Sequence, residues 1–506
     1  MTPEQAYDEL FRRMQEITLL GSTAGILGWD REVYMPAANA AYRAEQSSLL
    51  AGMIHQKFTD PTVGEWLAQA EASPAFAAEP LGDAAVNVRE WRRSYDRARK
   101  LPQKLVEELA RVTDNAQVEW VAARRENNFA RFQPWLEKIV ALTRQTAECY
   151  GYREHPYDAL LEDYEPGLTT AQLNRLFPPL KQRLSEMVTR ITTAKRQPDL
   201  AILKRPCAIP AQQAFCRKLA NAIGFDFDRG RIDVSAHPFT TGLGPADTRI
   251  TTRFEEANFE NSFFSTLHEA GHGIYDQGLP GGDGRYGTPR AAAVSLGIHE
   301  SQSRLWENLV GRSLPFWTHF FPELQKAFPG TFDDISLETF HFTINHSAPS
   351  LIRTESDEVT YNLHIAFRFD IETSLISGDL KAADVPAAWN EAVRKYLGVT
   401  PPDNAMGCLQ DVHWSHGSFG YFPTYTLGNL YSAQFFAAAS RDLGELDSRF
   451  EQGDFAPLKN WLNKTIHEHG QSYRAGDLCR KVTGRELSSE PFLAYLKEKF
   501  QPLYRF

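Results

Sequence analysis

A His-Glu-x-x-His run is the feature of this sequence that most directly indicates chemistry. It reads His268-Glu269-Ala270-Gly271-His272 and lies in a stretch of helical periodicity at 257–277. Two residues four apart on an α-helix project from the same face, so His268 and His272 can bind one metal ion. Glu269 is then placed to act as a general base on a water molecule, as in zinc peptidases.

A catalytic metal site of this kind needs a third protein ligand and one open position. Glu300 follows His272 by 28 residues, beyond a glycine-rich segment, on a helix expected at 300–311. Spacing alone does not choose between Glu300 and three competitors, which are His299, Asp276 and Glu307. The alternative without chemistry is a pair of surface histidines. The apolar side chains before the motif argue against it, because they indicate a buried helix: Phe263, Phe264 and Leu267.

Composition and charge exclude several classes of protein. The 506 residues are 42% hydrophobic and 23% charged, which is ordinary for a globular protein. A net charge of −10 leaves no basic excess, so we expect neither nucleic-acid binding nor membrane-surface binding. Five scattered cysteines predict no disulfide framework. With no secretion signal and no membrane-length apolar run, we expect a cytoplasmic protein.

Apolar residues at three- and four-residue spacing predict a mainly helical fold. Helices are expected at 3–18, 38–57, 84–98, 101–128, 130–149, 168–195, 209–224, 257–277, 300–311, 356–376, 384–397, 427–443 and 486–500. Pro178-Pro179 is expected to break or kink its helix. We expect a single domain over 1–506, either undivided or in two helical lobes, because no repeat or linker divides the chain.

Two irregular stretches flank the metal-binding motif. Alternating Thr, Ile and Arg around a Gly-Leu-Gly-Pro turn predict a β-hairpin within 231–254, just before the motif helix. After that helix, the glycine- and proline-rich segment 278–289 is expected to be a mobile loop beside the site.

The sequence resembles the carboxypeptidase Taq family of metallocarboxypeptidases over essentially its whole length. Besides the metal-binding motif, the blocks that carry the resemblance are His237-Pro238-Phe239, Asp247-Thr248-Arg249-Ile250-Thr251, His299-Glu300-Ser301-Gln302, Ile352-Arg353-Thr354-Glu355-Ser356-Asp357-Glu358 and Gly407-Cys408-Leu409-Gln410-Asp411-Val412-His413-Trp414. The family usually has Ala where Ser356 stands. The N-terminal stretches Ile26–Asp30 and Tyr34–Pro36 are also similar.

The resemblance implies a mainly helical fold with a deep central groove, similar to neurolysin-like peptidases, with the small sheet beside the groove. It implies a homodimer, Glu300 as the third ligand, and one zinc or cobalt ion per chain. The implied activity removes C-terminal residues one at a time from peptides with a free C-terminus. Side-chain preference is expected to be broad, with poor action on C-terminal proline.

Arg353 is the first candidate for binding the terminal carboxylate of a substrate, because a guanidinium can pair with it through two hydrogen bonds. The structural alternative is an ion pair with Asp357. Arg249 is the second candidate, although Asp247, Arg249 and Thr251 share one strand face and an Asp247–Arg249 pair is the more economical reading. The edge of that strand could also bind an extended peptide.

A peptidase of this type needs a neutral donor for the oxyanion of the tetrahedral intermediate. By its position in the resemblance Tyr425 is the first choice, Tyr421 the second, and His413 or His416 could assist. His237 joins Arg249, Tyr421 and His416 as a substrate-binding candidate.

Two side predictions concern polar residues around these candidates. Gln410 and Asp411 could orient His413 or cap a turn. His467-Glu468-His469 lacks the spacing of a helix face and is expected to be solvated surface.

Two other functions compete with a carboxypeptidase. An endo- or dipeptidyl-peptidase could use the same scaffold if the groove were open at both ends. A non-catalytic, metal-stabilised peptide-binding protein would be expected to lack Glu269, which is present.

Overall fold

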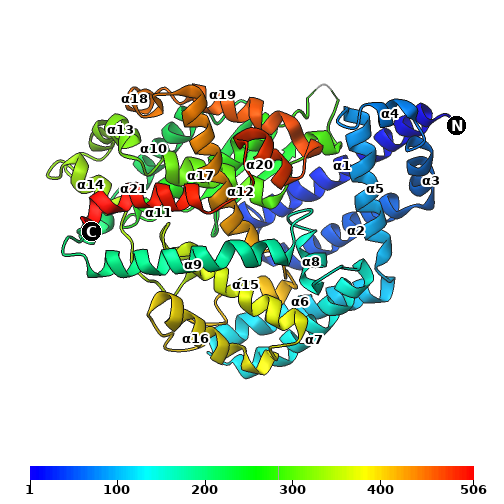
Figure 1. Cartoon of the computed structure of the whole chain (residues 1–506), viewed down its shortest axis with the longest axis horizontal. Coiled ribbons are helices and arrows are strands. Elements are labelled where there is room, and N and C mark those ends of the chain that lie inside the picture. Colours follow the sequence, from blue (N-terminus) through cyan, green and yellow to red (C-terminus); the bar gives the residue numbers. More distant parts are fainter. Residues whose placement is uncertain (283) are drawn as a thin grey trace.

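The computed structural model describes residues 1–282 and 284–506. It is mainly helical, with one small sheet (Figure 1). The helices are α1 Pro3–Val33, α2 Ala40–Thr59, α3 Pro61–Ala70, α4 Pro74–Ala78, α5 Asp83–Lys100, α6 Gln103–Arg125, α7 Phe129–Tyr150, α8 Pro156–Leu161, α9 Thr170–Thr193, α10 Ile209–Ala222, α11 Phe259–Gly278, α12 Leu296–Arg304, α13 Leu314–Ala327, α14 Leu337–Ile344, α15 Tyr361–Ser377, α16 Val385–Leu397, α17 Pro423–Leu443, α18 Leu446–Glu451, α19 Ala456–Thr465, α20 Ala475–Thr483 and α21 Glu490–Tyr504.

Helices α1 to α5 form one end of the molecule, shown in blue in Figure 1, and the two chain termini lie at opposite ends. The buried apolar side chains form two clusters. A small one joins α1, α3 and α5, and a large one runs from Val112 to Tyr504. This division is compatible with one domain in two lobes, which stays a prediction.

Most expected helices are present, with shifted ends. The first is much longer than predicted and continues to Val33. Pro178-Pro179 does not break its helix, because α9 is one helix from Thr170 to Thr193, and a kink there stays a prediction. The apolar face of α9, with Leu173, Phe177, Leu180 and Leu184 buried, holds it through the prolines.

The predicted hairpin consists of β2 (Thr240–Gly244) and β3 (Asp247–Thr252), which pair antiparallel. A third strand, β1 (Gly230–Val234), pairs parallel with β3, so the order is β1-β3-β2. The strand that carries Arg249 is therefore central and both its edges are paired. The prediction that its edge could bind a peptide is wrong.

Of the segment 278–289, Gly278 ends α11 and Pro289 begins a short 3-10 turn, Pro289–Ala291. The described residues between them form no α-helix or strand. Asp283, within the expected mobile loop, lies outside the described residues, and the mobility stays a prediction. All five cysteines are free, as expected. Across the described residues, no helix combines the length and apolarity needed to span a membrane.

Candidate active site

Three side chains from two neighbouring helices converge as a set of metal-binding donors. One donor atom from each of His268, His272 and Glu300 lies within 4.8 Å of the others. The Nε2 atoms of His268 and His272 are 3.7 and 3.3 Å from Oε2 of Glu300. The two histidine side chains stay 17% and 15% exposed, so the cluster opens toward solvent. The deep groove itself stays a prediction.

Glycines let the helices approach closely enough for this convergence. A Cβ added at Gly271 of α11 would lie 2.6 Å from the backbone oxygen of Gln302 on α12. One added at Gly428 of α17 would lie 2.7 Å from Cβ of Glu300. Helix α12 is thus held between α11 and α17 at two positions where only glycine fits, and this fixes where Glu300 stands.

His268 is supported by a carboxylate on its far ring nitrogen. Its Nδ1 lies 2.8 Å from Oε2 of Glu307, in a π-helical turn at Leu305–Val310 that follows α12. Arg304 joins this carboxylate to the cluster, because it donates to Glu300 at 2.7 Å and to Glu307 at 3.2 Å. Oε1 of Glu300 therefore accepts from Arg304, and Oε2 faces His268 and His272.

His272 is supported by a longer chain of hydrogen bonds. Its Nδ1 lies 2.5 Å from Nδ1 of His299, whose Nε2 is 2.9 Å from Oδ1 of Asp276. If Nε2 of His272 binds a metal, its Nδ1–H must donate to His299, and His299 must then donate to Asp276. Of the three rivals of Glu300, Glu307 contacts His268 and His299 contacts His272, whereas Asp276 contacts only His299.

Electrostatics favour the metal-binding forms of Glu300 and His272. Burial would lower the pKa of His268, but Glu300 and Glu307 outweigh burial and raise it. Burial would raise the pKa of Glu300, but Arg304 and His268 outweigh burial and hold that pKa well below its ordinary value. Burial, followed by the neighbouring His299, lowers the pKa of His272 to about 4. A charged carboxylate and a neutral imidazole are the forms that bind a metal ion.

Glu269 lies beside the cluster and is buried. Burial raises the pKa of its carboxyl group. The hydroxyl of Thr240, the first residue of β2, is 2.7 Å from Oε2 of Glu269. A buried carboxyl with a raised pKa next to a metal-binding cluster is suited to accept and return a proton.

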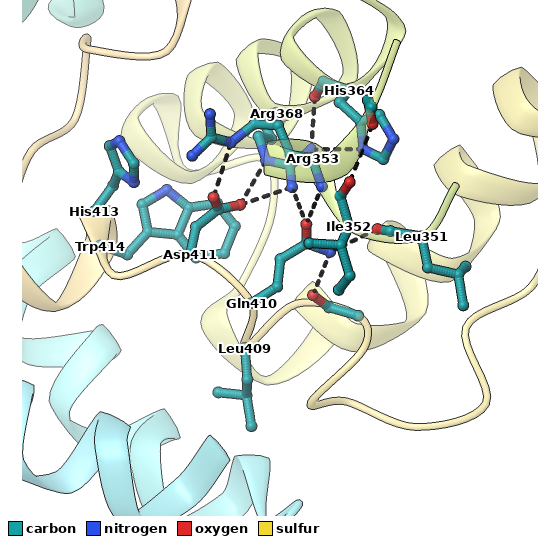
Figure 2. A network of polar contacts seen from close by, with 12 residues as sticks. Leu351, Ile352, Arg353, His364, Arg368, Leu409, Gln410, Asp411, His413 and Trp414 are labelled. Atoms are coloured by element: carbon teal, nitrogen blue, oxygen red, sulfur yellow. Dashed lines mark hydrogen bonds and ion pairs between the residues drawn. The ribbon is translucent and has the colours of Figure 1, made fainter. Parts of the chain in front are cut away.

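Arg353 lies in a buried network that Figure 2 shows. Its Nε donates to Asp411 at 2.9 Å, and Arg368 of α15 donates to the other Asp411 oxygen at 2.7 Å. Asp357 instead accepts from Ser347 and the 359–360 backbone, so the expected structural pair of Arg353 with Asp357 is absent.

Gln410 and Asp411 bind the two arginines and not His413. The side-chain oxygen of Gln410 accepts from the backbone of Arg353 and from Arg368 (Figure 2). The prediction that these residues orient His413 is therefore wrong. The alternative of capping a turn is confirmed for Gln410, whose side-chain amide donates to the backbone oxygens of Met406 and Gly407.

Tyr361 contacts both Arg353 and Arg304, and so connects the Asp411 network with the metal-binding cluster. Its hydroxyl accepts from Nη1 of Arg353 at 3.0 Å, and the guanidinium of Arg304 lies 4.5 Å from its ring centroid. Among the described residues, Nη2 of Arg353 has no hydrogen-bond partner. That nitrogen therefore keeps its donor hydrogens unpaired, in a side chain that is 7% exposed.

The oxyanion candidates form an aromatic group around Tyr425. His413 Nε2 lies 3.3 Å from the Tyr425 hydroxyl, and the Tyr421 ring centroid is 5.3 Å from that of Tyr425. Burial lowers the pKa of His413 to about 4 and raises that of Tyr425 well above its usual value. Both groups are therefore neutral near pH 7, as the role requires. His416 is exposed at the end of the short helix His413–His416.

Arg249 forms the ion pair with Asp247 that the sequence favoured over substrate binding. It donates to both oxygens of Asp247, at 2.9 and 2.8 Å, and stacks 4.3 Å from the ring of Trp29. His237 is exposed, and the structure gives its ring no hydrogen bond within the described part of the chain.

The prediction of a solvated His467-Glu468-His469 surface is wrong for His467. This side chain is fully buried, with hydrogen bonds to Gln302 at 2.9 Å and to Asn463 at 2.6 Å.

Sequence reasoning missed Thr240, Arg304, Tyr361 and Arg368. Arg304 follows Glu300 by four residues on one helix, so a helical-pair search could have found it. The others come from distant segments, and no local pattern in the sequence connects them to the motif.

Comparison with known proteins agrees with this geometry. Residues 9–500 match the model of the family described as carboxypeptidase Taq (M32) metallopeptidase. Thermostable carboxypeptidase 1 of Thermus thermophilus is 48% identical and covers 100% of both chains. Carboxypeptidase 1 of Bacillus subtilis is 36% identical, covering 98% of both.

A solved structure extends the agreement to the fold. The M32 carboxypeptidase of Deinococcus radiodurans R1 superposes with a TM-score of 0.96 at 37% identity, over 99% of this chain and 100% of that one. The chain therefore belongs to the carboxypeptidase Taq (M32) family of metallopeptidases.

Proposed function

We propose that this metallocarboxypeptidase holds one divalent ion, zinc or alternatively cobalt, through His268, His272 and Glu300. The observation that carries this assignment is the convergence of their donor atoms within 4.8 Å. Two imidazoles and one carboxylate are a common ligand set of catalytic zinc and leave a position open. When bound, the ion would polarise the scissile carbonyl and acidify the attacking water.

Glu269 takes the proton from that water and returns it to the leaving amine. Its raised pKa and its place one residue after His268 support this role. Tyr425, with His413 beside it, donates to the developing oxyanion. Tyr421 is held against Tyr425 and is the second choice for that donor.

The substrate is a peptide with a free C-terminus, whose carboxylate binds Arg353. The free Nη2 of Arg353 and its link through Tyr361 to Arg304 support this placement. Asp411 holds the guanidinium in orientation, and the two positive neighbours keep the pKa of Asp411 low despite its burial. We expect broad side-chain preference with poor action on C-terminal proline, in a cytoplasmic homodimer.

The test is mass spectrometry of peptides digested by the purified enzyme. Matched peptides with free and amidated C-termini are compared, each with and without a chelator. We expect single-residue losses from the C-terminus of the free acid, little action on the amide, and no action with chelator until metal is restored. Internal cleavage, release of dipeptides, or equal action on the amide would contradict the proposal.

A further inference from the structure

We propose that Thr240 is a positioning residue that holds Glu269 in the orientation needed for proton transfer. Its hydroxyl oxygen lies 2.7 Å from Oε2 of Glu269 and 2.9 Å from the backbone oxygen of the same residue. Among the described residues, no other side chain forms a hydrogen bond with this carboxylate. The inference rests on the proposed role of Glu269 as the base.

A glutamate needs such a partner to serve as a directed base. Its side chain has three rotatable bonds, and its two oxygens are equivalent until something distinguishes them. Thr240 binds Oε2 and thereby leaves Oε1 free to face the attacking water. A misplacement of about 1 Å at a reacting group can cost about 100-fold in rate.

The fold keeps Thr240 itself in place. It is the first residue of β2, where it pairs with Ile250 of the central strand β3. Strands β2 and β3 both pack against α11, the helix that carries Glu269. Threonine is branched at Cβ, so its side chain has few rotamers and the hydroxyl direction follows from the backbone. The small sheet therefore holds Thr240 where its hydroxyl can orient Glu269.

The contact can also persist through the reaction. The hydroxyl of Thr240 donates to Oε2 of Glu269 while the carboxylate is charged. When Glu269 carries the proton taken from water on Oε1, Oε2 keeps its lone pairs and still accepts from Thr240.

The next residue supplies a matched control. Thr241 follows on the same strand, is also partly buried, and projects from the opposite face. Its hydroxyl makes no hydrogen bond within the described residues. Thr241→Val therefore reproduces the chemical change of Thr240→Val, in the same strand, without touching Glu269.

The experiment measures kcat, KM, bound metal and thermal unfolding for Thr240→Val, Thr240→Ser and Thr241→Val. Losing a hydrogen bond to a charged group predicts a fall in kcat of roughly 10- to 100-fold for Thr240→Val, with KM and metal content unchanged. Thr240→Ser keeps the hydroxyl and should recover most of the loss. Thr241→Val should match the wild type.

A double-mutant cycle with Glu269→Gln separates positioning from a general structural effect. If Thr240 acts through Glu269, adding Thr240→Val to Glu269→Gln should not lower the residual turnover further. An equal loss in both backgrounds, or a wild-type kcat for Thr240→Val, would overturn the inference. Near-normal turnover of Glu269→Gln with bound metal would instead refute the base itself, whatever Thr240 does.

Discussion

At the scale of single residues, His268 and His272 differ in the hydrogen-bond partners of their Nδ1 atoms. His268 meets a carboxylate directly, at 2.8 Å from Glu307, whereas His272 reaches Asp276 only through His299. Partners of this kind fix the tautomer of a metal-binding histidine and strengthen its binding. The longer chain of hydrogen bonds allows a test, because the Asp276 carboxylate contacts His299 and none of the metal-binding atoms.

Asp276→Asn should weaken metal binding by roughly 10- to 100-fold, a range typical of such partners, because it removes the negative charge at the end of the chain. Competition with a chelator of known affinity measures the effect without reference to activity. Asp228→Asn removes an exposed charge and should leave affinity unchanged. Unaltered affinity in Asp276→Asn would mean that the His272–His299 contact works without its carboxylate.

In the proposed function, Arg353 decides which end of the substrate is recognised. If it binds the terminal carboxylate, Arg353→Ala should lose roughly 10- to 150-fold in kcat/KM on free-acid peptides, corresponding to about 1.5–3 kcal/mol. The ratio of free-acid to amide turnover should fall toward one, and this ratio is insensitive to any loss of folded protein. Arg353→Lys should recover only part, since an ammonium cannot form the two-point pair. Strong discrimination surviving in Arg353→Ala would assign the carboxylate to another residue.

Residue types and spacing could predict the pair of histidines and the candidate base, because four-residue spacing on a helix translates directly into geometry. Spacing could not rank Glu300 above its neighbours, since all four candidates do lie around the histidines. The ion pairs of Asp411 could not be predicted either, because Arg353 and Arg368 lie more than 40 residues away from it in the sequence.

At the scale of elements, the three- and four-residue spacing of apolar residues predicted most helices. It did not predict the turns and strand pairings between them. The π-helical turn at Leu305–Val310, which brings Glu307 to His268, has no periodic signature in the sequence. The third strand β1 was also missed, because parallel pairing with β3 is a long-range choice. Pro178-Pro179 illustrates the converse, where packing of an apolar face outweighs a local preference for breaking the helix.

The glycine contacts of α12 make a prediction at this scale. Gly428→Ala would press a methyl group against Cβ and Cγ of Glu300 and displace α12 or α17. Overpacking typically costs about 1–3 kcal/mol of stability. Metal affinity should fall although every ligand is present. Calorimetry and chelator competition on the same variant measure both effects.

Gly21→Ala is the control for this change, since nothing lies within 4 Å of the Cβ it would add on α1. Helix propensity should make this variant neutral or slightly more stable. If Gly428→Ala binds metal with wild-type affinity, the close approach of α17 does not determine the position of Glu300.

At the scale of the whole molecule, an apolar surface on α2 lacks a partner among the residues that the structure describes. Helix α2 has a single buried residue, Arg43, yet it presents Tyr42, Leu49 and Met53 at 61%, 66% and 39% exposure. These positions are seven and four residues apart and so form one stripe. Leu19 and Ile26 add to the exposed apolar surface on α1, which packs against α2. Grouped apolar side chains of this kind mark association surfaces.

If the proposed homodimer uses this stripe, charges placed on it should dissociate the dimer. Light scattering after size-exclusion chromatography should give the wild type twice the chain mass of 57.2 kDa. The double variant Leu49→Arg, Met53→Arg should give the chain mass alone, because two like-charged patches would face each other across a two-fold axis. Val118→Arg places the same charge on α6, at a residue that is 67% exposed, and should remain dimeric. Dissociation by Val118→Arg alone would move the interface to α6, and a monomeric wild type at micromolar concentration would contradict the dimer itself.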